Sequence, residues 1–205
     1  MSTDQYQVLA STRHFQGRVL TLRTDEVRMS DGRVATREIV EHPGAVAVVA
    51  LDDDDQVVLV NQYRHPVHRY LDELPAGLLD VAGEPAVLAA QRELKEETGL
   101  AAAHWYVLVD LFTSPGMTDE AIRIFLARGL SEAPGERFVP EHEELTLTVS
   151  RVPLDDAVGQ ALRGELTNAA AVAGVCAAAT ARAAGWPALR PADAPWSGRP
   201  QSATA

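Results

Sequence analysis

The fold is decided by two adjoining stretches, Gly77-Leu78-Leu79-Asp80-Val81-Ala82-Gly83-Glu84 and Arg92-Glu93-Leu94-Lys95-Glu96-Glu97-Thr98-Gly99-Leu100. Residues 85–98 predict a helix, because proline suits the first helical position and Gly99 suits the position after the last turn. On that helix Glu93 and Glu97 share one face, and Glu96 borders it. A cation would relieve the repulsion between these carboxylates, and oxygen ligands without thiols favour Mg²⁺ or Mn²⁺.

On spacing alone, a solvated acidic helix face is the favoured interpretation of these glutamates. Two features favour the metal site. A loop bounded by Gly77 and Gly83 would bring backbone carbonyls to the same ion. The preceding run, Leu74-Pro75-Ala76-Gly77, indicates a fixed backbone path rather than a generic linker.

Together the two stretches resemble the motif of the Nudix hydrolases. That motif reads Gly, five residues, Glu, seven residues, then Arg-Glu-aliphatic-any-Glu-Glu-any-Gly-aliphatic. From Glu84 to Leu100 every required position matches, whereas six residues rather than five separate Gly77 from Glu84. The resemblance implies an α/β fold, a Nudix-type α/β/α sandwich with a mixed sheet, preceded by an N-terminal antiparallel strand segment.

The resemblance also implies roles for individual residues. Glu93 and Glu97 are the expected main metal ligands, with support from Glu96 and from the carbonyl of Ala76. The residues expected to be structural, by bracing loop and helix or shaping the turns, are Gly77, Glu84, Arg92 and Gly99. The expected cofactor is Mg²⁺, with Mn²⁺ as the alternative ion.

The flanks of the motif resemble the ADP-ribose pyrophosphatase branch of the family, at residues 36–46, 61–64, 73–77 and 114–120. In that branch, arginines near Arg37 and Arg64 contact substrate, some of them from the partner subunit of a homodimer. Glu120 is a further candidate contact. The planar guanidinium group binds phosphate in a bidentate manner and stacks on adenine. The implied reaction converts ADP-ribose and water to AMP and ribose 5-phosphate.

A second acidic cluster, Glu141-His142-Glu143-Glu144, precedes a predicted strand at residues 145–152. Its simplest interpretation is a solvated loop. In the enzymes it resembles, a glutamate at this point acts as the catalytic base, and Glu144 aligns best, with Glu143 as the reserve.

Two groups of alternatives stay open. Another enzyme of the same fold would use a different nucleotide sugar, NADH or a dinucleotide polyphosphate. A non-catalytic Nudix-like domain would only sense ADP-ribose, but such a domain should carry a degraded motif, and this motif is nearly complete.

The composition is ordinary for a globular protein, with 46% hydrophobic and 23% charged residues. A net charge of -11 would repel phosphate backbones, so nucleic acid is not an expected partner. Cys176 has no second cysteine to pair with and is expected to be a buried, inert thiol. Without a signal peptide or an apolar run of about 18 residues, the chain is expected to be cytoplasmic and not membrane-bound.

The chain divides into three expected parts. Residues 1–42 are a strand segment for dimerisation. Up to Gly32 this segment is expected to be irregular chain with short strands at 19–22 and 25–29. A return strand is expected at 34–41. Residues 43–185 are the Nudix domain, in which Asp52 to Asp55 form a turn and helices begin near Pro153 and Asn168. Residues 186–205 are a tail, mobile or draped over the surface.

Overall fold

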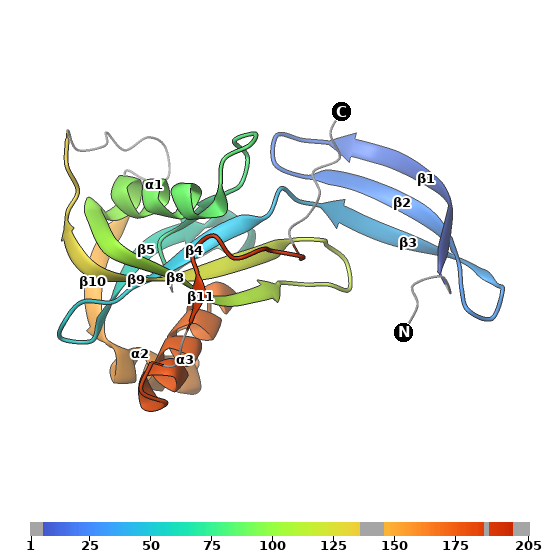
Figure 1. Cartoon of the computed structure of the whole chain (residues 1–205). Coiled ribbons are helices and arrows are strands. Elements are labelled where there is room, and N and C mark those ends of the chain that lie inside the picture. Colours follow the sequence, from blue (N-terminus) through green and yellow to red (C-terminus); the bar gives the residue numbers. More distant parts are fainter. Residues whose placement is uncertain (1–5, 136–145, 187–188, 199–205) are drawn as a thin grey trace.

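The computed structural model describes residues 6–135, 146–186 and 189–198 of the chain. Its strand layer lies between helix α1 (Ala86–Thr98) on one side and helices α2 (Leu154–Arg163) and α3 (Ala169–Ala183) on the other (Figure 1). This arrangement confirms the α/β/α sandwich that the sequence predicted.

The strand layer contains two sheets. The larger sheet, in the order β11-β8-β9-β4-β7, consists of β4 (Ala45–Ala50), β7 (Ala76–Leu78), β8 (Leu100–Phe112), β9 (Ala121–Glu132) and β11 (Arg190–Pro191). It is mixed, because β4 runs parallel to β9 and antiparallel to β7. The smaller sheet is antiparallel, in the order β10-β5-β6, and consists of β5 (Gln56–Arg64), β6 (Arg69–Glu73) and β10 (Thr148–Pro153).

Strand β4 is buried on both faces, which explains its uninterrupted run of alanine and valine. Side chains alternate along a strand, so Val46 and Val48 pack toward α1 while Ala47 and Val49 pack toward α2 and α3. The small residues of α3 let that helix approach the sheet closely. At Gly174, an added Cβ would lie 2.6 Å from a methyl carbon of Leu74, so nothing larger than glycine fits there without a shift.

The N-terminal segment forms a third sheet, in the order β1-β2-β3, that projects to one side of the sandwich (Figure 1). Its strands are β1 (Gln7–Gln16), β2 (Thr21–Arg28) and β3 (Val34–Glu41), joined antiparallel. The expectation of irregular chain at the start was wrong, because residues 7–16 form β1, whereas the short strands expected at 19–22 and 25–29 lie largely within the single strand β2. Long-range pairing with β2 holds β1 extended, although its sequence has little apolar alternation. The turn at Gly32, where φ is 82°, is confirmed.

The described part of the C-terminal tail lies along the larger sheet. Arg123, on β9, is almost fully buried and donates hydrogen bonds to the carbonyls of Ala194 and Pro195 at 2.6 and 3.2 Å. Arg123 and Arg190 both pair with Asp110. Burial alone would raise the pKa of Asp110, but these hydrogen bonds and charges outweigh it and lower that pKa. Of the two arrangements considered for the tail, this part adopts the draped one.

Smaller sequence-based expectations are largely confirmed. Asp52 to Asp55 lie in the turn between β4 and β5. Asn168 caps α3, accepting a hydrogen bond from the backbone N–H of Ala171. Pro85 is extended and precedes the helix, so the predicted start was one residue too early. In the described ranges, no helix has the length and apolar character needed to cross a membrane.

Candidate active site

The candidate site forms where β7 passes the middle of α1. Strand β7 pairs with β4, and this pairing brings Gly77 against the helix. An added Cβ on Gly77 would lie 2.0 Å from the carboxyl carbon and one carboxyl oxygen of Glu93. A Cβ at residue 77 would therefore force the flexible Glu93 side chain to move, so this close approach, and not an unusual φ angle, favours glycine here.

Glu97, one helical turn after Glu93, reaches the same backbone segment. Its Oε2 accepts a hydrogen bond from the Ala76 N–H at 3.0 Å. Burial raises the pKa of Glu97 to about 8, and the negative charge of Glu93 adds to the rise, whereas the Ala76 hydrogen bond opposes it. The surroundings of Glu97 thus do not fully compensate the negative charge that its carboxylate would carry.

Arg92 connects the loop before α1 with the helix. Its guanidinium group donates to Glu84 at 3.2 and 3.4 Å, to Glu93 at 2.6 Å and to Glu96 at 3.1 Å. These carboxylates raise the pKa of Arg92 further above its ordinary value. Through this one side chain, the loop that ends at Glu84 is fixed to the face of α1 that carries the other glutamates.

The donor set fits a hard divalent cation. Burial raises the pKa of Glu93 too, and the nearby Glu96 and Asp80 carboxylates add to the rise, while Arg92 opposes it. In the described part of the chain, no three acidic, histidine or cysteine groups stand at mutual ligand distances. Glu93 and Glu97 would therefore have to turn toward an ion, and an ion would supply the compensation that their buried charges lack.

Arg64 is next to this cluster, at the end of β5. It forms a bidentate ion pair with the buried Glu73 of β6, at 2.7 and 2.9 Å. Both groups act electrostatically on Glu97, with Arg64 lowering its pKa and Glu73 raising it. The structure therefore places Arg64, which the sequence suggested as a substrate contact, beside the carboxylates of α1. Sequence reasoning missed Glu73 as its partner, because their pairing depends on the register of β5 against β6.

Glu120 lies at the start of β9, in a loop that holds the end of β3. Its carboxylate accepts a hydrogen bond from the Thr113 hydroxyl group. The Nδ1 atom of His42 lies 3.6 Å from Glu120 and accepts a hydrogen bond from the Gly44 N–H at 3.2 Å. The backbone N–H of Val40 donates to the Met117 carbonyl at 2.8 Å, which joins this loop to the N-terminal sheet.

Arg37 lies on β3, and its contacts belong to the N-terminal sheet. The guanidinium group donates to the Thr36 carbonyl at 3.0 Å and to the sulfur of Met29 at 3.6 Å. The other two sequence-based candidates, Glu143 and Glu144, lie outside the described residues.

Comparison with known proteins places this geometry in a family. The family model described as the NUDIX domain matches residues 41–173. The chain belongs to the Nudix family. A second family model, described as the nucleoside diphosphate sugar hydrolase N-terminal domain, matches residues 6–40, which cover most of the projecting sheet. Nudix enzymes of the kind matched here are hydrolases that depend on a divalent metal ion.

Individual Nudix relatives resemble most of the chain. An ADP-ribose pyrophosphatase from Mycobacterium tuberculosis is 48% identical over 98% of this chain and 95% of its own. A methanol dehydrogenase activator from Bacillus methanolicus is 41% identical over 70% of this chain and 76% of its own. A crystal structure of an ADP compounds hydrolase superposes with a TM-score of 0.75 at 25% identity, covering 91% of this chain and 99% of that chain.

The close contact at Gly77 yields a first prediction. In Gly77→Ala, the new methyl group must displace the Glu93 carboxylate, so affinity for Mg²⁺ should fall by roughly 10- to 100-fold. Gly116→Ala is a matched control, because a Cβ at that position meets no other atom within 4 Å and Gly116 has no positive φ angle. Isothermal titration with Mg²⁺ and thermal melting would measure both variants. Equal Mg²⁺ affinity in Gly77→Ala and wild type would contradict the proposed role of Glu93.

Proposed function

We propose that this protein hydrolyses the diphosphate bond of ADP-ribose to give AMP and ribose 5-phosphate, with Mg²⁺ as the working ion. The observation that carries the proposal is the similarity of nearly the whole chain, including the N-terminal sheet, to an ADP-ribose pyrophosphatase at 48% identity. The solved ADP compounds hydrolase, which matches over 91% of the chain, supports the same class of substrate.

The proposed roles follow from the geometry. A bound divalent ion neutralises and orients the diphosphate and makes attack by water easier. Glu93 and Glu97 hold that ion on α1, and Gly77 leaves room for the Glu93 carboxylate. Arg64 is positioned beside them by Glu73, and its partly exposed side chain would contact a phosphate oxygen. Glu144 takes the proton of the attacking water, a role that rests on the sequence resemblance alone.

A substrate screen tests the proposal. Purified protein would be incubated with ADP-ribose, other nucleoside-diphosphate sugars, NADH and dinucleotide polyphosphates, each with Mg²⁺, and phosphate release would be measured after phosphatase treatment. We expect kcat/KM for ADP-ribose to exceed the others by about tenfold or more. EDTA should abolish turnover, and added Mg²⁺ should restore it. Full turnover in excess chelator would contradict the metal site, and binding of ADP-ribose without turnover would indicate a sensor.

We further propose that two copies form each substrate site. Every residue of β1 is exposed in the single chain, and the N-terminal sheet carries a set of exposed apolar side chains: Tyr6, Val8, Leu9, Phe15, Val19, Leu20, Leu22 and Val34. Such a surface is typical of an interface rather than of a free sheet. A second copy would cover it and would bring Arg37 of one N-terminal sheet toward the α1 face of the other chain.

The dimer proposal predicts a change in mass. Light scattering at micromolar concentration should give twice the chain mass of 22.1 kDa. The double variant Val8→Glu, Phe15→Glu places charges on the exposed apolar sheet and should give monomers with a raised KM for ADP-ribose. Leu162→Glu changes an 82% exposed leucine on α2 and is the matched control. A fully active wild-type monomer would contradict the proposal.

A further inference from the structure

The tip of the β5–β6 hairpin carries a group of polar side chains that the proposed hydrolysis does not use. A 3₁₀ turn, His65–Val67, joins the two strands. The Tyr63 hydroxyl lies 3.5 Å from the Nδ1 atom of His65 and 3.5 Å from the Nδ1 atom of His68. Good hydrogen bonds are shorter, at about 2.7–2.8 Å for O–H···O and about 2.9–3.0 Å for N–H···O. Three potential ligand atoms therefore gather here without a strong hydrogen bond among them.

The backbone and a neighbouring ring hold this arrangement in place. His68 adopts φ 53°, a left-handed conformation that is uncommon outside glycine but that histidine adopts more often than most residues, and its N–H donates to the His65 carbonyl at 3.1 Å. Tyr63 and Tyr70 face each other across the two strands, with ring centroids 5.4 Å apart. The turn therefore orients both imidazoles toward the Tyr63 hydroxyl, which the contact with Tyr70 restrains.

The spacing matches that of ligands around a tetrahedral ion. Imidazole nitrogens bind Zn²⁺ at about 2.0–2.1 Å, which puts neighbouring ligand atoms of a tetrahedron about 3.3 Å apart. Two such imidazoles on one ion have ring centroids about 5 Å apart by the same geometry. The rings of His65 and His68 are 5.0 Å apart, at 77° to each other. The distances from the Tyr63 hydroxyl to the two Nδ1 atoms and the distance between the two ring centroids thus both agree with one ion bound between these side chains.

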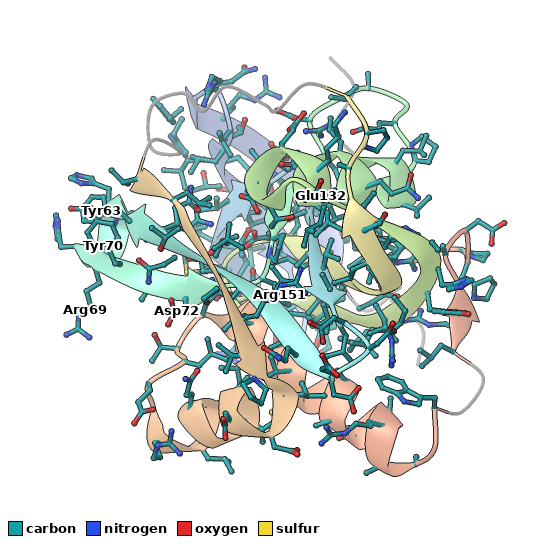
Figure 2. All side chains as sticks on the ribbon, turned by 90° about the vertical axis from the view of Figure 1, so that its left-hand side faces the viewer. Tyr63, Arg69, Tyr70, Asp72, Glu132 and Arg151 are labelled. Atoms are coloured by element: carbon teal, nitrogen blue, oxygen red, sulfur yellow. The ribbon has the colours of Figure 1, made fainter. Side chains whose placement is uncertain are left out.

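The charged side chains near the hairpin tip do not prevent a cation from binding between Tyr63, His65 and His68. The guanidinium group of Arg64 is turned to Glu73, which offsets its charge. Arg69 extends outward from the hairpin, away from Tyr63 and Tyr70 (Figure 2). Both histidines are exposed, so an ion reaches them directly from solvent.

We propose that Tyr63, His65 and His68 form a second metal site, for a divalent transition-metal ion that prefers imidazole, namely Zn²⁺ or a close relative such as Ni²⁺ or Cu²⁺. The two Nδ1 atoms and the phenol oxygen supply three ligands, and water completes the tetrahedron. Nitrogen ligands distinguish this site from the all-oxygen site on α1, because Mg²⁺ binds imidazole poorly.

Zinc titration tests the site directly. Tag-free protein in excess Mg²⁺ would be titrated with ZnCl₂ by calorimetry. The double variant His65→Ala, His68→Ala should lose one equivalent of bound Zn²⁺, or bind it at least about tenfold more weakly. His104→Ala, which removes another exposed histidine on β8, is the matched control and should bind as wild type does. Unchanged Zn²⁺ binding by the double variant, or loss of the same equivalent in Glu97→Gln, would overturn the proposal.

Binding of Cu²⁺ tests whether Tyr63 is a ligand of the proposed site. When CuCl₂ is added, a phenolate ligand produces a charge-transfer absorption band in the visible range that imidazole and carboxylate ligands do not. Wild type and Glu97→Gln should both show the band, and Tyr63→Phe should lose it while keeping most of the copper affinity. A band that persists in Tyr63→Phe, or is absent in wild type, would remove Tyr63 from the site. These readouts need no substrate, so they are independent of the proposed hydrolase activity.

Discussion

Glu97→Gln is expected to reduce kcat/KM for ADP-ribose by roughly 100-fold or more at subsaturating Mg²⁺. The variant removes a charged ligand from the metal site but keeps an oxygen that can accept from the Ala76 N–H. Raising the Mg²⁺ concentration should restore part of the rate. The measurement is the rate as a function of Mg²⁺ concentration. A rate that is unchanged at every Mg²⁺ concentration would exclude Glu97 as a ligand.

The same variant should change the dependence of stability on pH. The pKa of Glu97 is raised to about 8 in the fold, above its ordinary value of 4.5. The folded state therefore keeps a proton that the unfolded chain loses, and this group makes the metal-free protein less stable as the pH rises from about 4.5 to about 8. In Glu97→Gln that loss should disappear, which denaturant unfolding in EDTA at several pH values would show as a smaller slope than in wild type. An identical slope in both proteins would contradict the raised pKa.

Glu144→Gln is expected to reduce kcat by roughly 10²- to 10⁴-fold, because glutamine can accept a hydrogen bond from water but cannot take its proton. Affinity for substrate and for Mg²⁺ should change little, and extra Mg²⁺ should not restore the rate. A higher pH should restore part of it by supplying hydroxide. The measurement is kcat against Mg²⁺ concentration and pH, in parallel with Glu97→Gln.

One control variant makes the result specific. Glu143→Gln removes the neighbouring carboxylate and should leave kcat close to that of wild type. If Glu143→Gln instead abolishes turnover while Glu144→Gln does not, the catalytic base is Glu143. If neither variant lowers kcat, the base is outside this cluster.

Much of the framework could be predicted from local sequence. The helix over residues 86–98 follows from Pro85 before it and Gly99 after it. The turn at Gly32 and the N-cap at Asn168 follow from the chemistry of those residues. The buried run of β4 follows from composition alone. These features depend on residues a few positions apart, whose preferences act before any tertiary contact forms.

The extent of the N-terminal strands could not be predicted in this way. Strand β1 is exposed along its length in the single chain, so it carries no alternation of apolar and polar residues to reveal it. Its extended backbone depends on hydrogen bonds with β2 across the turn between them. The course of the tail depends likewise on Arg123, whose partners Ala194 and Pro195 are about 70 positions away along the chain.

The sequence by itself determined the family resemblance and placed Glu93 and Glu97 on one face of α1, with Glu96 at its border, because helical periodicity fixes which side chains share a face. Only the tertiary structure decided what those glutamates meet. The register of β7 against β4 places Gly77 against Glu93, and the register of β5 against β6 places the Arg64–Glu73 pair beside Glu97. Strand register is set by packing across the whole core, so no local pattern in the chain specifies these contacts.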